Sequence, residues 1–218
     1  MNVQLLAHTP APEQLVAASA KLCYSAASIA DLAAIEADKA AEFIEKLPEA
    51  HQSPFEHVSF TFGIEGVSRA MLAQITRHRI ASFSVQSQRY VEMDHFAYVT
   101  PPSIADNDDV NEFYHNFMRL SREYYNLMRA AGIPAEDARF VLPNACETRM
   151  IVTMNARELL HFFSLRCCKR AQWEIRAVAD EMLRLCKEVA PEIFAKAGPG
   201  CVRGCCPEGK GGCKNENM

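Results

Sequence analysis

The sequence lacks the features that mark several large classes of protein. No G-x-G-x-x-G run follows an expected strand, and no G-x-x-x-x-G-K-[ST] run is present, which excludes the Rossmann and P-loop solutions to nucleotide binding. No apolar run approaches the length of a membrane span, and the first residues lack the charged-then-apolar order of a signal peptide. We therefore expect a cytoplasmic protein without a membrane partner.

An excess of charge of one sign is also missing. Lysine and arginine total 23 against 27 aspartates and glutamates, which gives a net charge of −4. Any basic site must therefore be local, and we expect no nucleic-acid partner. With 218 residues, 49% of them hydrophobic and 23% charged, the chain is long enough for one large globular domain. In the cytoplasm its nine cysteines would be mostly reduced thiols.

Hydrophobic periodicity predicts a mixture of helices and strands. Alternating apolar residues predict strands, and apolar residues at three-and-four spacing predict helices. The expected strands cover residues 3–7, 57–66 and 148–154. The expected helices cover residues 13–24, 29–47, 68–79, 110–131, 134–140, 156–168 and 171–197. After the expected helix 68–79, residues 80–89 look like a serine-rich loop.

Residues 198–218 differ in composition from the rest of the chain. They contain six of the nine glycines and the cysteines Cys201, Cys205, Cys206 and Cys213. Such a series could supply thiolates to zinc or an iron–sulfur cluster, but it lacks the paired C-x-x-C units of established sites. We expect a disordered, reduced tail without metal, following a domain of residues 1–197.

The most informative stretch is RHRIASFSVQSQRY, residues 77–90. Guanidinium groups bind phosphate through two parallel hydrogen bonds, and hydroxyl and backbone N–H groups complete such a site. The RHR run, Ser87 and Arg89 therefore favour a small anionic ligand, whereas a solvated basic helix end is the alternative.

Gln74 lies three residues before Arg77 and four before His78, so the three side chains should share a helical face. A surface hydrogen-bond network remains the alternative for Gln74.

A second group of cations lies on the expected helix 156–168, whose side chains are apolar almost all round. Such a helix is buried or lies at a subunit interface. Asn155 and Arg166 fall on one stripe, and Arg157 and His161 on another. Unpaired buried charge is costly, so these cations need either bound anions or internal carboxylates. The available carboxylates include Glu147, Glu158 and Glu174.

Other candidates for chemistry are weaker. His51 and His57 flank Glu56 in HQSPFEH, but their spacing matches no standard ligand pattern, so we expect no metal site. Ser87 lacks a G-x-S-x-G elbow, and Cys146 has no base motif beside it. These residues do not indicate nucleophilic catalysis.

Four blocks, in order, resemble the flavin-dependent thymidylate synthase family. The family's signature is RHR followed seven or eight residues later by serine, and residues 77–79 with Ser87 fit it. The other matching blocks are HQSPFEHVSFTF (51–62), EDARFVLP (136–143) and NARELLHFFSLR running on to AQWEI (155–175). The resemblance spans about residues 1–197.

The resemblance implies an α/β fold of the α+β type, with a single domain whose central, mainly antiparallel sheet is flanked by helices. It implies a homotetramer with active sites where subunits meet. The implied reaction methylates deoxyuridylate (dUMP) to thymidylate (dTMP), with carbon from 5,10-methylenetetrahydrofolate and hydride from NADPH through FAD. A non-catalytic flavin- or nucleotide-binding protein of the same fold is the alternative.

The resemblance also assigns residues. FAD would be held by Ser53, Arg77, His78, Arg79, Val85, Asn155, Arg157 and His161. The dUMP would be held by Gln74, Arg77, Ser87, Gln88, Arg89, Arg139 and Arg166. Arg166 is the expected catalytic residue, because it could polarise the uracil, and Ser87 would bind phosphate. Two positions depart from the family: Val85 stands where a glutamate is common, and His161 where many members have asparagine, although His161 can still donate to flavin.

Overall fold

The computed structural model describes residues 1–47, 51–204, 206, 209 and 213. Its sheet has four strands in the order β1-β2-β4-β3. Thr9 N donates to Ser59 O where β1 ends and β2 begins, and Ala156 N donates to Val58 O where β4 ends and β2 begins, so these neighbours are antiparallel. The expected mixed fold with an antiparallel sheet is confirmed. The strands are β1 (Asn2–His8), β2 (Ser59–Ser68), β3 (Ala81–Val85) and β4 (Glu147–Asn155).

The helices mostly match the periodicity of the sequence. They are α1 (Pro12–Leu22), α2 (Ile29–Ala33), α3 (Ala37–Glu45), α4 (Arg69–Ile75), α5 (Pro102–Ala105), α6 (Asp108–Ala130), α7 (Ala135–Ala138), α8 (Ala156–Arg166) and α9 (Trp173–Val189). The described residues also form the 3-10 helices η1 (Ser53–His57), η2 (Arg139–Val141) and η3 (Gly200–Arg203). Within the described residues, no helix has the length and apolarity needed to cross a membrane.

Three predicted helices need correction. The helix expected over residues 29–47 is two helices, because Glu36 is extended at the start of α3; the surrounding alanines favour helix and give no local sign of this break. The helix expected over 68–79 ends at Ile75: Thr76 N and the Thr76 hydroxyl both donate to Leu72 O, and Arg77 N donates to Gln74 O at 3.3 Å in a tighter turn. The last expected helix, 171–197, ends at Val189, two residues before Pro191, which cannot continue a helix.

The serine-rich loop expected over residues 80–89 contains the strand β3. Ala81, Phe83 and Val85 are half-buried, while Ser82 and Ser84 are exposed. This is the alternation of a strand with one solvated face. The prediction of a loop is therefore wrong for these residues. The serine-rich composition of the segment masks the alternation of a strand.

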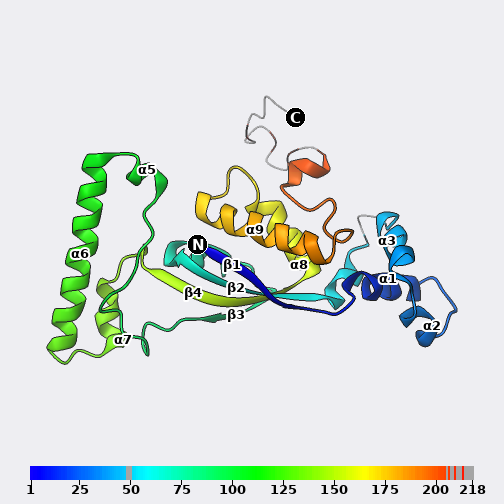
Figure 1. Cartoon of the computed structure of the whole chain (residues 1–218), viewed down its shortest axis with the longest axis horizontal. Helices are drawn as coiled ribbons and strands as arrows, with labels where there is room; N and C mark the ends of the chain where they lie inside the picture. The colour runs from blue at the N-terminus through cyan, green and yellow to red at the C-terminus, as the bar shows by residue number, and fades with distance from the viewer. Residues whose placement is uncertain (48–50, 205, 207–208, 210–212, 214–218) are drawn as a thin grey trace. The chain divides into compact units, whose positions relative to one another are not determined.

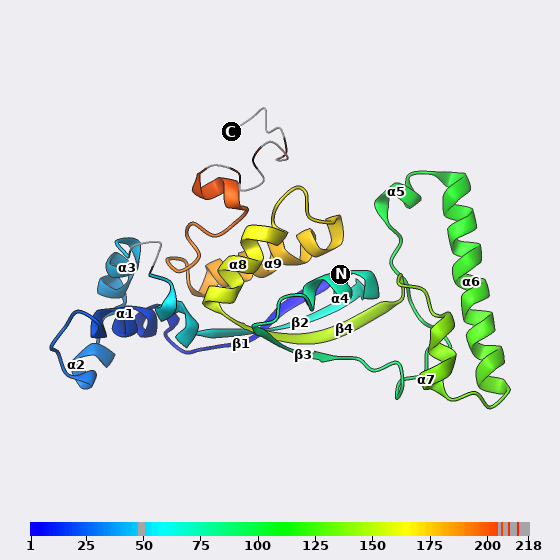
Figure 2. The same cartoon turned by 180° about the vertical axis from the view of Figure 1, so that it is seen from behind.

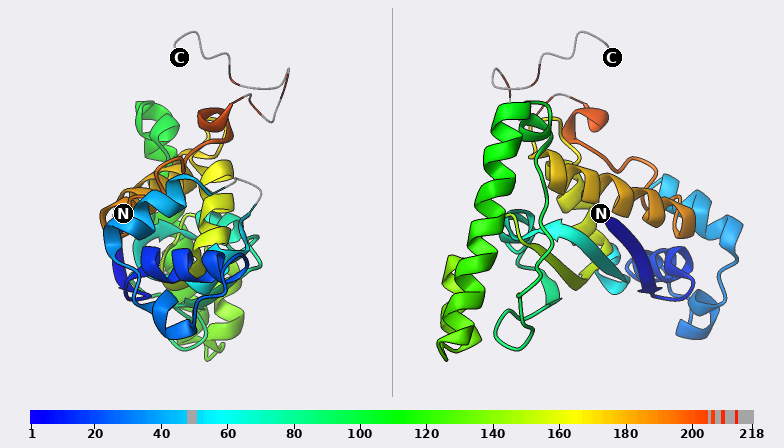
Figure 3. Two further views of the ribbon diagram at one scale, coloured as in Figure 1. Left: turned by 90° about the vertical axis from the view of Figure 1, so that its right-hand side faces the viewer. Right: turned by 60° about the vertical axis from the view of Figure 1, so that its left-hand side comes forward.

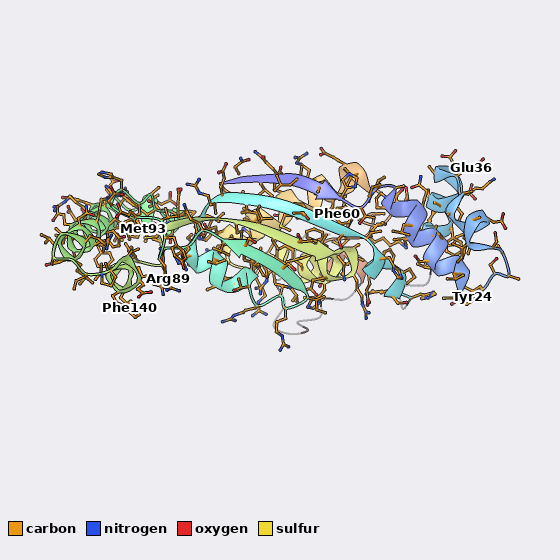
Figure 4. All side chains as sticks on the ribbon, turned by 90° about the horizontal axis from the view of Figure 1, so that it is seen from below. Tyr24, Glu36, Phe60, Arg89, Met93 and Phe140 are labelled. Atoms are coloured by element: carbon orange, nitrogen blue, oxygen red, sulfur yellow. The ribbon has the colours of Figure 1, made fainter. Side chains whose placement is uncertain are left out.

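The chain divides into two compact units. Unit 1 contains residues 1–2, 64–77 and 84–150, and unit 2 contains the described residues of 3–63, 78–83 and 151–218. In unit 2, α8 and α9 lie together over one face of the strands (Figures 1 and 2). A chain of aromatic rings forms its core: Phe60 of β2 (Figure 4) meets Phe194 at 5.4 Å, and Phe194 meets Phe163 at 5.9 Å.

In unit 1, α6 is one continuous helix with α7 beside it (Figure 3). One face of α6 packs into a core that includes Met93, Phe96, Met118 and Tyr125. The Tyr125 hydroxyl accepts from Met93 N at 3.2 Å, so this buried polar group is satisfied. Gly132 follows the C-cap residue Ala131 with φ +85°, a left-handed conformation that glycine adopts readily after the end of a helix.

Candidate functional site

His78, the centre of the RHR run, is buried in unit 2 with 5% of its surface exposed. Its Nδ1 lies 2.9 Å from Glu158 Oε1. Its Nε2 lies 3.2 Å from Arg166 Nε. The three side chains therefore form a chain, Glu158–His78–Arg166, that joins the RHR run to both ends of α8.

The chain of contacts fixes the protonation state of His78. A guanidinium N–H can only donate, so Nε2 must accept, and the single proton of the ring sits on Nδ1 and is donated to the Glu158 carboxylate. Burial lowers the pKa of His78 below its ordinary value of 6.5, the hydrogen bond to Glu158 opposes this, and the Arg166 charge lowers the pKa further. His78 is thus a neutral link between an anion and a cation.

The start of α8 explains why Glu158 faces His78. Asn155 is the N-cap of α8, and its side-chain oxygen accepts from Glu158 N at 2.9 Å. Glu158 then lies in the first turn, where a negative charge is favoured, on the buried face with Leu159 and Phe162. The other side of α8 is not buried in the described chain, since Leu165 is 45% exposed. Of the two alternatives for this helix, full burial within one chain does not hold, and a subunit interface there stays a prediction.

Internal carboxylates accompany the cations of α8. Arg157 forms an ion pair with Glu56 of η1, and Arg166 reaches Glu158 through His78. The sequence left two kinds of partner open for these cations, bound anions and internal carboxylates. The structure contains the internal carboxylates. Both Arg157 and Glu56 are about half exposed, so their pairing leaves the guanidinium accessible to a ligand.

Several of the residues expected to hold flavin lie at one cavity of unit 2. Its volume is about 520 Å³, which lies in the range of small-molecule sites. The start of α8 forms part of its wall, and the N-terminus of a helix is a favourable place for a phosphate group. The lining residues are Gln52, Glu56, Ile80, Asn155, Arg157, Glu158 and His161.

Three residues expected to hold flavin line this cavity directly, namely Asn155, Arg157 and His161. Two more are neighbours of lining residues in the chain: Ser53 follows Gln52, and Arg79 precedes Ile80, and both are exposed. The size of the cavity and its donors fit part of a flavin nucleotide. Gln52 and Ile80 also line the cavity, and no pattern in the sequence predicts them there.

A second cluster lies in unit 1 and joins the motif loop to the end of α7. The Ser87 hydroxyl accepts from Arg89 N at 3.1 Å. Arg89 binds the Glu136 carboxylate through Nε at 2.9 Å and Nη2 at 2.8 Å, and Arg139 Nε donates to Glu136 O at 3.0 Å. Glu136 thus brings Arg89 (Figure 4) and Arg139 together. Its role was missed, because 47 residues separate it from Arg89.

The remaining residues expected to bind dUMP also lie mostly in unit 1. Gln88 is 7% exposed, and among the described residues its Nε2 has no hydrogen-bond partner. Gln74 is on the last turn of α4, and Arg77 N donates to Gln74 O at 3.3 Å. The prediction that Gln74, Arg77 and His78 share one helical face is wrong, because α4 ends at Ile75 and the chain turns there.

The two expected sets of residues fall largely into different units. The flavin set lies in unit 2 except for Arg77 and Val85, and the dUMP set lies in unit 1 except for Arg166. The RHR run crosses the boundary, since Arg77 belongs to unit 1 and His78 to unit 2. Along the chain, the RHR run therefore joins the unit that contains most of the expected dUMP ligands to the unit that contains most of the expected FAD ligands.

Thiol chemistry has little support in the described residues. Burial raises the pKa of Cys146 to about 12 and also raises the pKa values of Cys167 and Cys186, so these thiols are protonated and unreactive near neutrality. No group of three or more His, Cys, Asp or Glu suited to a metal ion occurs where the structure describes the chain. Cys205 and much of the tail lie outside the described residues.

Comparison with known proteins gives one consistent family. Residues 4–192 match the model of the family described as thymidylate synthase complementing protein. Flavin-dependent thymidylate synthase of Geobacter sulfurreducens is 55% identical over 96% of this chain and 92% of that protein. Its counterpart in Nitratidesulfovibrio vulgaris is 53% identical with the same coverage. The fold is that of the Helicobacter pylori flavin-dependent thymidylate synthase solved with FAD and dUMP, with TM-score 0.73, 24% identity and coverage of 91% of this chain and 100% of that one. The chain belongs to the flavin-dependent thymidylate synthase family.

Proposed function

We propose that this protein methylates dUMP to dTMP, with 5,10-methylenetetrahydrofolate as carbon donor and NADPH as reductant through FAD. Its family membership supports this activity. The structural observation that carries the proposal is the Glu158–His78–Arg166 chain beside the unit 2 cavity. It links the expected flavin site to the arginine expected to act on the uracil.

Asn155, Arg157 and His161 would hold FAD in the unit 2 cavity. The bound flavin supplies hydride chemistry, and the protein contributes orientation and charge. Arg157 offers a cation near the N-terminus of α8, where a diphosphate would be favoured. His161 is exposed at the cavity and can donate a ring N–H to a flavin oxygen.

Arg166 would polarise the uracil and favour its ionised N3. A guanidinium has five N–H donors, so the bond from Nε to His78 is compatible with bonds to a nucleobase. That bond also restricts the rotation of the side chain, which places the cation before the substrate arrives. His78 acts here as a positioning residue: it stays neutral, and a protonated ring would repel Arg166.

Arg89, Arg139 and the Ser87 hydroxyl would bind the phosphate of dUMP. Both arginines bind Glu136, Arg89 at the carboxylate and Arg139 at the backbone oxygen, and paired guanidinium groups match a phosphate dianion. The Glu136 carboxylate would then act as a clamp on Arg89 that is loosened when phosphate binds. Ser87 serves as a hydrogen-bonding group and forms no covalent bond.

The proposal includes assembly and location. We propose a homotetramer in the cytoplasm, with a catalytic domain of residues 1–197 and active sites completed where subunits meet. The family resemblance supports the tetramer, and the continuous family match over residues 4–192 supports the domain. The exposure of Arg77, Arg79 and Arg89 is compatible with contacts to another subunit.

Flavin content tests the proposed cofactor site. We expect purified protein to be yellow, and NADPH with dUMP to bleach the absorption of the oxidised flavin. Ile80→Glu places a carboxylate in the cavity wall and should reduce the FAD retained. Val202→Glu is the matched control, since Val202 is also exposed in unit 2 but lies outside the family match.

Colourless protein that takes up no added FAD would refute the proposed cofactor. Flavin that binds but is never bleached by NADPH and dUMP would support a non-catalytic binding protein instead. Equal loss of FAD from both variants would show that the cavity is not the flavin site.

A further inference from the structure

A second cavity, the unit 1 cavity, has no part in the reaction proposed above. Its volume is about 520 Å³, which lies in the range of small-molecule sites. The residues expected to hold FAD or dUMP are not among those that line it. The lining comes from the start of β1, the end of β2, the start of β4 and the segment 91–97 that follows the motif loop.

Helix α6 fixes the segment that lines this cavity. Three side chains on one side of the helix bind it: Arg122 Nη2 donates to Phe96 O at 2.7 Å, Asn126 Nδ2 to Asp94 O at 3.3 Å, and Arg129 Nη2 to the Glu92 carboxylate at 3.0 Å. Met93 (Figure 4), which also lines the cavity, is held by Tyr125. A wall that is already fixed loses little freedom when a ligand binds.

The start of β4 brings polar groups without partners to this cavity. Glu147, Thr148 and Arg149 all line it. Within the described chain, the side chains of Glu147 and Arg149 form no hydrogen bond or ion pair. Thr148 is 4% exposed, and its Oγ1 has no hydrogen-bond partner among the described residues. Unsatisfied buried groups are costly, so the cavity is a place where polar partners are missing.

The charges around the cavity restrict the class of ligand. Four carboxylates line it, those of Glu65, Glu92, Asp94 and Glu147, against the one guanidinium of Arg149, so a phosphate or another polyanion would be repelled. In the part of the chain that the structure describes, no three acidic, His or Cys side chains are placed to hold a metal ion. An organic ligand with an ammonium group remains.

The position of Arg149 adds a requirement for an anionic group on the same ligand. Glu147 and Arg149 are alternate residues of one strand, so they lie on the same face, about 7 Å apart along it. Glu65 already accepts from Asn2 Nδ2 at 2.9 Å, and Glu92 is paired with Arg129. The two opposite charges that lack partners are therefore those of Glu147 and Arg149.

We infer that the unit 1 cavity binds a small amino acid, with its carboxylate at Arg149 and an ammonium group at Glu147. Charge-assisted hydrogen bonds of this kind are among the strong ones. Because carboxylates outnumber cations in the lining, an amino acid with a second ammonium group fits better than a neutral one. L-lysine has this chemistry and serves as the probe.

The cavity adjoins the loop expected to hold the phosphate of dUMP. Gln86 and Val91 line the cavity and flank that loop, which contains Ser87 and Arg89. Gln86 N donates to Arg149 O, and Val91 N donates to Ser87 O, both at 3.0 Å. A ligand in the cavity would hold both ends of the loop and strengthen dUMP binding. This step rests on the proposed dUMP site, whereas binding of the amino acid does not.

Isothermal titration of the full-length, flavin-loaded protein with L-lysine tests the site. We expect saturable binding that Glu147→Gln and Arg149→Met each weaken roughly 10–100-fold. Arg119→Met is the matched control, because Arg119 is an exposed arginine of the same unit that pairs with Glu123, and its affinity should be unchanged. Cadaverine, which lacks the carboxylate, should bind more weakly than L-lysine and be insensitive to Arg149→Met.

Three results would overturn the site: no saturable binding of L-lysine, an affinity that neither Glu147→Gln nor Arg149→Met changes, or cadaverine binding as tightly as L-lysine. Far-ultraviolet circular dichroism shows whether each variant is folded, and Glu147→Gln nearly preserves the shape of the side chain, so at least one variant reports on binding alone.

Equilibrium binding of dUMP tests the link to the loop. Saturating L-lysine should tighten dUMP binding at least about fivefold, and by reciprocity dUMP should tighten L-lysine binding by the same factor. An unchanged affinity for dUMP would overturn the link. Failure of dUMP to bind at all would instead refute the proposed function, and the titration with L-lysine alone would still decide the site.

Discussion

Replacing Glu158 probes the buried hydrogen bond on which the position of His78 depends. Glu158→Ala would leave His78 Nδ1–H without its partner at a site where the ring is 5% exposed, which costs about 1–3 kcal/mol. It would also remove the acidic group in the first turn of α8, worth roughly 0.3–1 kcal/mol. We expect the free energy of unfolding to fall by about 1–4 kcal/mol. Glu158→Gln keeps an acceptor oxygen and should cost only about 1 kcal/mol.

Urea unfolding measures these changes. The single tryptophan, Trp173, begins α9, which packs against α8, so its fluorescence reports on this part of the fold. Glu56→Ala is the control, because it removes an ion pair that is about half exposed and should cost less than about 1 kcal/mol. If Glu158→Ala is as stable as the unmodified protein to within about 0.5 kcal/mol, the Glu158–His78 bond does not hold His78, and our account of Arg166 positioning fails.

Three further predictions concern pH, catalysis and substrate binding. The lowered pKa of His78 means that below pH 6.5 the unfolded chain binds a proton that the folded chain does not. Stability should therefore be full above pH 6.5 and fall as pH drops towards the folded pKa, and His78→Asn should flatten that fall in thermal melts. Arg166→Ala should retain FAD and fold while turnover drops by about 10²–10³, with no rescue by Arg166→Lys; loss of folding would assign Arg166 a structural role instead. Arg139→Ala should raise KM for dUMP about tenfold with little change in kcat, and an unchanged KM would remove Arg139 from the phosphate site.

The regular elements of the fold were predictable where one period dominated. Strict alternation predicted β2, and three-and-four spacing predicted α6 and α8. The strand β3 was missed because exposed Ser82 and Ser84 resemble loop residues. The break before Glu36 was missed because alanines on both sides favour helix. For β3, pairing with β4 in the sheet overrides the loop-like composition, whereas nothing local in the sequence marks the break at Glu36.

The site was predictable as a set of residues but not as a set of contacts. The resemblance to the family named both His78 and Arg166, yet no spacing predicts that they meet across 88 residues. Glu158 was only one of several available carboxylates, and its burial beside His78 decides its role. Likewise, the pairing of Arg157 with Glu56 spans 101 residues. Such long-range pairings depend on the folded chain, so a single sequence holds no local signal for them.

Product analysis tests the central claim most directly. The purified full-length protein is incubated with dUMP, and the nucleotides are separated by chromatography and identified by mass. We predict dTMP only when protein-bound FAD, 5,10-methylenetetrahydrofolate and NADPH are all present, and none when the folate or NADPH is omitted or when the flavin has first been removed. Absence of dTMP from the complete mixture, with flavin bound, would contradict the proposed function, as would dTMP formed at the same rate by flavin-free protein.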